Sequence, residues 1–187
     1  MTEEVNMALE EAKEQMSQAI SHLTVELQKI RAGKANPSML DSVTVDYYGS
    51  PTALSQVANV NTLDARTITV QPWEKSMLDE IAKGIINSNL GLNPQNNGEV
   101  IIINIPVLTE ERRKDLVKKA KAEGENAKVS IRNQRKEAND YIKSLKEDGL
   151  SEDFAKRGED EVQKIVDLHS KKIDDLILLK EKDIMTV

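Results

Sequence analysis

The sequence predicts an α+β protein of two domains, in which a small β/α/β domain is inserted into a long three-helix bundle. Apolar residues recur with a helical period over residues 1–33 and again over residues 107–187. A period of two, typical of strands, appears only between these segments. A long amphipathic helix cannot bury its apolar face alone. The terminal helices are therefore expected to pack together, with residues 34–106 as the inserted domain.

The first helix is expected over about the first thirty residues. Its apolar positions step by three or four and include a seven-residue repeat, formed by Leu9, Met16, Leu23 and Ile30. At about 1.5 Å per residue, such a helix is ~45 Å long. The pattern stops at Gly33, and Asn36 precedes a proline, which disfavours helical backbone at this point.

The middle of the chain shows short elements separated by turn residues. Strands are expected at residues 43–47, 67–70 and 99–105, where apolar and β-branched residues alternate or follow one another. The spacing of apolar residues predicts a short helix at residues 77–85. Gly and Pro after the first strand predict a turn, and residues 93–98, rich in Asn, Pro and Gly, predict a loop.

Two more long helices are expected after the inserted segment. Thr109 is suited to cap the first of them, because its side chain can accept a hydrogen bond from the helix N-terminus and two acids follow it. The helical pattern runs to about Leu145 and is broken at Gly149. Ser151 is suited to cap the last helix, which is expected to end near Ile184. The two helices are about 58 and about 51 Å long at the usual rise per residue.

The chain passes between the two predicted domains twice, near residues 31–35 and 104–107. A paired crossing of this kind can act as a hinge. The residues assigned to this hinge are Arg31, Gly33, Lys34, Ile105 and Pro106. A rigid interface between the domains is the alternative, and the sequence favours neither over the other.

The composition excludes several classes of protein. The absence of cysteine rules out disulfides, thiolate chemistry and cysteine-based zinc sites. Aromatic residues make up only 3% of the chain, too few for a platform that stacks single-stranded bases. A formal net charge of −6 excludes a generally basic nucleic-acid coat. Because no apolar run approaches the ~20 residues of a membrane span and the N-terminus is acidic, we expect a cytoplasmic protein with no membrane partner.

The second long helix differs in charge from the rest of the chain. Residues 112–146 carry 12 basic and 5 acidic side chains, a net charge of +7. At about 100° per residue, most of these cations fall within a sector of ~100° beside the apolar face. Glu125 is the one acid in that sector. The cations of this sector, called the basic ridge below, are Lys114, Lys118, Lys121, Lys128, Arg132, Arg135, Lys136, Lys143 and Lys146.

The basic ridge has two interpretations. Its cations are either solvated and paired with acids of adjacent helices, as is usual on long helices, or they bind an external polyanion. Acids four residues away would alternate with cations on a face built for internal pairing, and nearly all are absent within this helix. A straight basic surface without aromatic residues suits the phosphate backbone of structured RNA or DNA. The predicted binding residues are Lys114, Lys118, Lys121, Lys128, Arg132 and Arg135.

No motif predicts catalysis. The sequence lacks the P-loop and dinucleotide-binding glycine patterns, and its histidines lack the spacing of a metal site. His169 is expected to be packed on the apolar side of the last helix, and His22 is expected to be exposed. Carboxylate pairs such as Asp174 and Asp175 are expected on solvated helix faces. We therefore expect a protein that is not an enzyme and that holds neither a metal nor a cofactor.

Eight motifs resemble the bacterial ribosome recycling factor family, in the same order and over essentially the whole chain. They are IRAGKANP at 30–37, YYGSP at 47–51, LGLNP at 90–94, PVLTEERR at 106–113, VSIRNQRKEAN at 129–139, SED at 151–153, VQK at 162–164 and KEKDIM at 180–185. The resemblance implies a three-helix bundle joined by two hinge strands to a small β/α/β domain. It also implies an L-shaped outline like that of tRNA.

The resemblance implies a function as well. Factors of this family bind the ribosome after termination and, with GTP-bound elongation factor G, split it into subunits at the intersubunit region. Elongation factor G supplies the GTPase activity and moves the inserted domain, whereas the bundle contacts large-subunit ribosomal RNA. Arg132 and Arg135 match arginines of that contact. The chain is thus expected to be a monomeric translation factor whose partners are the ribosome and elongation factor G.

Two other functions stay open on the residues alone. A coiled-coil protein that binds other proteins through exposed apolar helix faces would self-associate and bind with little salt dependence. An enzyme of phosphate chemistry that uses His22 or His169 would lose activity when that histidine is replaced by alanine. Co-sedimentation with ribosomes across a salt series separates both functions from binding to RNA.

Overall fold

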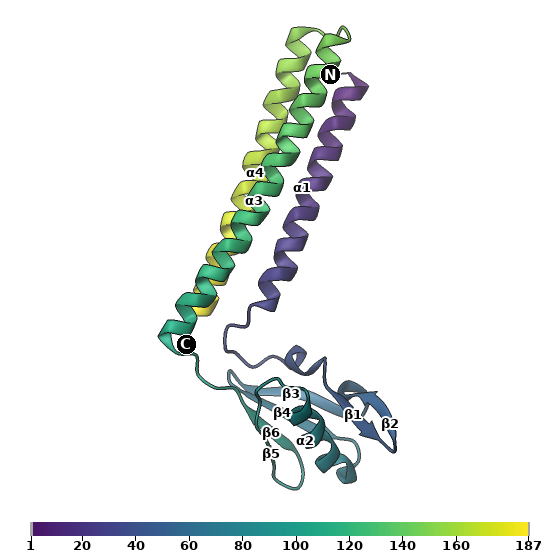
Figure 1. Ribbon diagram of the computed structural model, residues 1–187, viewed down its shortest axis with the longest axis vertical. Coiled ribbons are helices and arrows are strands. Elements are labelled where there is room, and N and C mark those ends of the chain that lie inside the picture. The colour runs from purple at the N-terminus through teal and green to yellow at the C-terminus, as the bar shows by residue number, and fades with distance from the viewer. Residues whose placement is uncertain (1, 187) are drawn as a thin grey trace. The chain divides into compact units, whose positions relative to one another are not determined.

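The computed structural model describes residues 2–186 and divides the chain into two compact units (Figure 1). The helical unit comprises the described chain up to Ala32 and again from Thr109, and the inserted unit is Gly33–Leu108. The sequence places these boundaries after Gly33 and after Pro106. The predicted class, long helices at both ends of the chain and a small α+β unit between them, is confirmed. No helix within residues 2–186 is both long and apolar enough to span a membrane.

The helical unit consists of three long helices, α1 (Glu3–Lys29), α3 (Glu110–Glu147) and α4 (Glu152–Met185). Each of them packs against the other two, and they run side by side in Figure 1. The apolar stripes that the sequence shows on these helices therefore face one another. The helix ends lie close to the predicted ones because Gly, Pro and capping residues act locally on the backbone.

Two hydroxyl side chains start the helices that follow the inserted unit. The Thr109 hydroxyl oxygen accepts a hydrogen bond from the Arg112 N–H at 3.2 Å, at the start of α3. The Ser151 hydroxyl oxygen accepts one from the Phe154 N–H at 3.4 Å, at the start of α4. Both predicted caps are confirmed, and acidic residues occupy both first turns, where the helix dipole stabilises them.

The core of the helical unit is a stripe of aliphatic side chains. All members of the predicted seven-residue repeat are at most 9% exposed: Leu9, Met16, Leu23 and Ile30. On α3 the buried residue of the first turns is Leu116, whereas Val117 is only partly covered. At Gly124 the helices approach closely, since a Cβ atom there would lie 2.7 Å from Cγ1 of Ile177 on α4. The glycine thus lets α3 and α4 come together within the stretch of α3 that carries the basic ridge.

The inserted unit contains two antiparallel sheets and one α-helix. Its strands and helix are β1 (Thr44–Tyr47), β2 (Ser50–Ala53), β3 (Ala58–Asp64), β4 (Thr67–Pro72), α2 (Leu78–Asn87), β5 (Pro94–Asn96) and β6 (Ile101–Asn104). Short 3-10 turns lie at Pro37–Leu40, Leu54–Gln56 and Lys75–Met77. β1 and β2 form a hairpin, and the other four strands form a sheet of order β3-β4-β6-β5. The core of this unit lies between the strands and α2, with Ile68, Val70, Ile81 and Ile103 all fully buried.

Three strands of the inserted unit were not expected from the sequence. The predicted loop at residues 93–98 contains β5, and its prediction is wrong because Asn and Pro are tolerated on an edge strand that pairs only with β6. β2 and β3 are rich in Ser, Asn and Thr and lack a strong apolar alternation. Their partners β1 and β4 hold them in strand conformation through backbone pairing, which local propensity does not reveal.

Replacing Gly84 by alanine is expected to destabilise the inserted unit by about 1–3 kcal/mol. A Cβ atom at Gly84 of α2 would lie 2.7 Å from the backbone oxygen of Thr44 on β1, so the helix must move away from the hairpin. The better helix propensity of alanine, about 1 kcal/mol, offsets only part of this cost. Thermal unfolding followed by circular dichroism measures the change. Asn87→Ala, on the exposed end of the same helix, is the control and is expected to leave the melting temperature unchanged.

The two segments that join the units are both tied to the turn between β3 and β4. The Ala35 N–H donates to the Ala65 carbonyl at 2.8 Å, and the Ile105 N–H donates to the Arg66 carbonyl at 2.7 Å. Ile105 is only 7% exposed and belongs to the core of the inserted unit. The other predicted hinge residues lie outside these anchored positions, and Arg31, Lys34 and Pro106 are exposed while Gly33 is half-buried.

Candidate nucleic-acid interface

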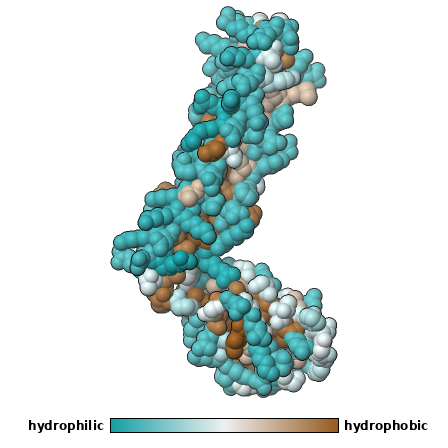
Figure 2. All heavy atoms as spheres, viewed as in Figure 1, coloured by the Kyte–Doolittle hydropathy of each residue, from teal (hydrophilic) through white to brown (hydrophobic). Residues whose placement is uncertain are grey.

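The basic ridge lies along the solvent side of α3. Lys114, Lys118, Lys121, Arg132 and Arg135 are exposed, whereas the Lys128 side chain is only 28% exposed. The buried residues of α3 occupy the neighbouring face, at Ala120, Ala127, Ile131, Ala138 and Ile142 among others. In Figure 2, hydrophilic residues cover much of the visible face of the long helices. The helical core therefore holds the ridge cations on a straight, rigid support.

Five ridge cations form ion pairs, and four of these cations have a partner outside the segment 112–146 used for the charge count; one of the five is Lys146, which pairs with Glu152 of α4 at 3.0 Å. Lys114 pairs with Glu110 at 3.0 Å and Lys121 with Glu181 at 3.3 Å. Lys128 pairs with Asp174 at 2.7 Å, and Arg132 lies 3.5 Å from Glu125. Glu181 and Asp174 belong to α4, and Glu110 precedes the segment used for the charge count. Spacing within one helix cannot reveal partners that another helix supplies.

These pairs differ in how strongly they hold the cations. Both side chains are more than 60% exposed in the Lys114–Glu110 and Arg132–Glu125 pairs, and exposed pairs contribute little to stability. An incoming phosphate can therefore exchange for either carboxylate at small cost. Lys128 is the most enclosed of the predicted binding residues and has a second carboxylate, Glu125, at 3.8 Å. It is the ridge member most involved in linking α3 to α4.

Part of the ridge beyond Glu125 consists of cations that have no ion pair within the described residues. Within residues 2–186, Arg135, Lys136 and Lys143 have no ion pair. A hollow of about 370 Å³ lies there, lined by Arg132, Arg135, Lys136, Asn139 and Asp140. The Asn139 Oδ1 atom at its edge is buried and has no hydrogen-bond partner within the described chain. Guanidinium groups one turn apart can each donate two hydrogen bonds to a phosphate, so this hollow is suited to the backbone of a nucleic acid.

The two histidines have the places that the sequence predicts. His169 is 2% exposed between α4 and α1. Its Nδ1–H donates to the Ile165 carbonyl at 2.7 Å, so its Nε2 accepts from the Ser17 hydroxyl at 3.3 Å. His22 is exposed on α1. One ring nitrogen of His169 is therefore bound within α4 and the other contacts α1, which gives this histidine a structural role.

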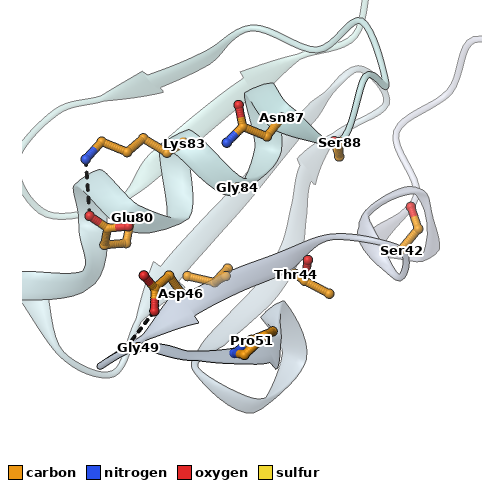
Figure 3. A pocket seen from close by; sticks show the side chains of 11 residues that line it. Ser42, Thr44, Asp46, Gly49, Pro51, Glu80, Lys83, Gly84, Asn87 and Ser88 are labelled. Atoms are coloured by element: carbon orange, nitrogen blue, oxygen red, sulfur yellow. Dashed lines mark hydrogen bonds and ion pairs between the residues drawn. The ribbon is translucent and has the colours of Figure 1, made fainter.

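A polar groove of about 530 Å³ lies in the inserted unit, between α2 and the β1–β2 hairpin (Figure 3). Lys83 and Glu80 point toward one another across one turn of α2 and pair at 3.2 Å. The Asp46 carboxylate accepts a hydrogen bond from the Gly49 N–H at 2.7 Å. These contacts order the surface of α2 and the tip of the hairpin, so the charged groups of the groove serve the local fold.

Comparison with known proteins gives the family to which the chain belongs. A model of the family described as "Ribosome recycling factor" matches residues 23–185. The chain belongs to the ribosome recycling factor family. The ribosome-recycling factor of Christiangramia forsetii is 58% identical over 185 residues, which cover 99% of this chain and 100% of that protein. That of Flavobacterium johnsoniae is 56% identical over 187 residues, covering 100% of both chains.

Solved structures of ribosome recycling factors share this fold. A solution structure of the factor has a TM-score of 0.75 and 34% identity, with 100% of both chains covered. A second match has a TM-score of 0.61 and 44% identity over 100% of both chains. It is the T. thermophilus ribosome recycling factor, in models with E. coli elongation factor G bound to the E. coli post-termination complex. Ribosome binding and a role in ribosome recycling follow for this family member, and the family resemblance of its motifs is confirmed.

Proposed function

We propose that this chain splits post-termination ribosomes into subunits together with elongation factor G and GTP, and that it has no catalytic activity of its own. The observation that carries this proposal is the basic ridge of α3, where Arg135 and Lys136 have no ion pair within residues 2–186, in a chain of net charge −6. Large-subunit ribosomal RNA is the ligand of the ridge, because a rigid row of cations without aromatic residues matches a folded phosphate backbone. The protein acts as a cytoplasmic monomer.

The inserted unit is the moving part in this proposal. Each unit has its own core, and only two segments join them. Ala35 and Ile105 are hydrogen-bonded to the β3–β4 turn, so the backbone that is left to rotate is at Arg31–Lys34 and from Pro106 onward. Elongation factor G would displace the inserted unit while the ridge stays on the large subunit. The displacement would then break the contacts between ribosomal subunits.

Light scattering of post-termination ribosomes tests this function directly. Ribosomes, elongation factor G and GTP are mixed with and without the protein, and a faster fall in scattering is expected when it is present. Equal rates with and without the protein would refute the function. Sedimentation of the free protein is the second readout, because the competing coiled-coil function requires self-association through exposed apolar helix faces.

Replacing Arg132 by alanine is expected to weaken binding to the large subunit by about tenfold, the usual loss for one charge-assisted hydrogen bond. The salt dependence of binding should fall by about one phosphate contact. Co-sedimentation with large subunits at several salt concentrations measures both. Lys172→Ala, an exposed lysine on α4, is the matched control. Unchanged binding and slope for Arg132→Ala would mean that Arg132 serves only its pair with Glu125.

A further inference from the structure

The tip of the β1–β2 hairpin carries a tyrosine in an unusual backbone conformation. Tyr48 has φ +50° and Gly49 has φ +85°, and these are the two central residues of the turn that joins Tyr47 to Ser50. A two-residue turn with both φ angles positive favours Asn followed by Gly, because a larger side chain is strained there. The backbone conformation therefore does not favour an aromatic residue at this position, so the contacts of the ring must account for it.

The Tyr48 ring is held in place by its neighbours. Its hydroxyl donates to one oxygen of the Glu74 carboxylate at 2.8 Å, and the Tyr47 hydroxyl donates to the other at 3.1 Å. The two rings meet edge to face, with centroids 4.7 Å apart and planes at 76°. The hydrogen bond to Glu74 raises the pKa of the Tyr47 phenol. The Asp46 carboxylate holds the turn through Gly49 (Figure 3).

Despite these contacts, the Tyr48 side of the hairpin remains open to solvent. Tyr48 is 75% exposed, and Trp73, which precedes Glu74, is 68% exposed. Burial of the ring therefore contributes little to folding of the unit. An exposed aromatic ring whose orientation is already set loses little entropy when another protein covers it, and such residues commonly anchor protein interfaces.

The charge around this ring indicates the kind of group that it binds. Residues 34–107 carry 4 basic and 7 acidic side chains; Glu74 contacts the Tyr48 hydroxyl, and Asp46 binds the backbone of the same turn. Phosphate groups of RNA are repelled by such a surface. Each Glu74 oxygen accepts one tyrosine hydroxyl and keeps a further lone pair. An arginine side chain can lie over the exposed Tyr48 face and donate to Glu74 at once.

We propose that the surface formed by Tyr47, Tyr48 and Glu74 docks an arginine side chain of elongation factor G. This inference rests on the proposed function, in which that factor displaces the inserted unit. The ring supplies a rigid apolar contact, and the carboxylate supplies the charge that selects arginine over a neutral side chain. The strained turn presents the ring outward, and Asp46 preserves that presentation.

Tyr48→Asn tests the proposal, because asparagine suits the turn and removes the ring. Thermal unfolding of this variant is expected to match the unsubstituted protein, and its binding to ribosomes alone should agree within twofold. The elongation factor G concentration that gives half-maximal splitting should rise about tenfold, the loss of one interfacial anchor. Tyr48→Phe keeps the ring and should raise this half-maximal concentration by less than threefold. Glu74→Gln, at an exposed position, should raise the half-maximal concentration severalfold. This variant tests the carboxylate independently of the turn.

The outcomes separate this inference from the function on which it rests. Splitting by the unsubstituted protein, with an unchanged half-maximal concentration for both Tyr48→Asn and Glu74→Gln, would overturn the docking site alone. A loss of ribosome binding by Tyr48→Asn in the absence of the elongation factor would also overturn it, since the ring would then contact the ribosome. No splitting by the unsubstituted protein would refute the proposed function itself.

Discussion

Replacing Arg135 and Lys136 together by glutamate is expected to weaken binding to ribosomes about 100-fold or more. Both side chains lack an ion pair within the described chain and line the hollow on the basic ridge. Each charge-assisted hydrogen bond to a phosphate contributes about 1.5–3 kcal/mol, so losing two costs at least about 3 kcal/mol. The new carboxylates would add repulsion from the phosphates. Co-sedimentation with large subunits measures the loss, and the splitting rate should fall with it.

The matched control for this variant carries the same change of charge elsewhere. Lys171 and Lys172 are adjacent, exposed and on α4. On α4, Asp174 pairs with the ridge and Ile173 is buried. At about 100° per residue, Lys172 lies on the far side of the helix from Asp174, whereas Lys171 lies about 60° from Asp174 and is exposed to solvent. Lys171→Glu/Lys172→Glu should weaken binding less than threefold at ~0.15 M salt, where distant charges are screened. Equal losses of affinity for the two variants would mean that net charge alone governs binding and that the ridge is not the binding site.

The long helices, and the face of α3 on which the basic ridge lies, could be predicted because both depend on residues that are close together in the sequence. Thr109 and Ser151 each satisfy an N–H group within three residues, and an apolar stripe is visible in the sequence wherever it is long enough. The position of each ridge cation on α3 follows from the helical period, so its exposure could be predicted as well. Among the ridge cations, all of which lie in the described part of the chain, only Lys128 is partly covered, because α4 packs against it.

The pairing of the ridge cations could not be predicted, because it depends on how two helices align. Asp174 and Glu181 stand 46 and 60 residues from their partners Lys128 and Lys121, and no spacing rule links such distant positions. The strands β2, β3 and β5 were missed for a similar reason, since backbone pairing with stronger neighbours holds them. The hairpin tip was visible as Tyr47-Tyr48-Gly49, but its hydrogen bonds to Glu74 become apparent only in three dimensions.

Replacing Ile68 by alanine is expected to destabilise the inserted unit by about 2–5 kcal/mol and to leave the helical unit unchanged. Ile68 is 0% exposed on β4, the strand that pairs with both β3 and β6, so its removal leaves a cavity at the centre of the sheet. The core cluster that contains it is drawn only from residues 39–105. Each kcal/mol lowers the melting temperature of a unit this small by about 4–8 °C. The transition should therefore move down by about 8 °C or more in this unit alone.

Two spectroscopic signals distinguish the units. The single tryptophan, Trp73, belongs to the inserted unit, whereas most helical residues belong to α1, α3 and α4. Ile68→Ala should lower the midpoint seen by Trp73 fluorescence and leave that of helical circular dichroism in place. Ile142→Ala, at a 0% exposed position of α3, should do the reverse. If both signals moved together in both variants, the units would unfold as one cooperative body, and a hinge between them would lose its physical basis, because independent motion requires independently stable cores.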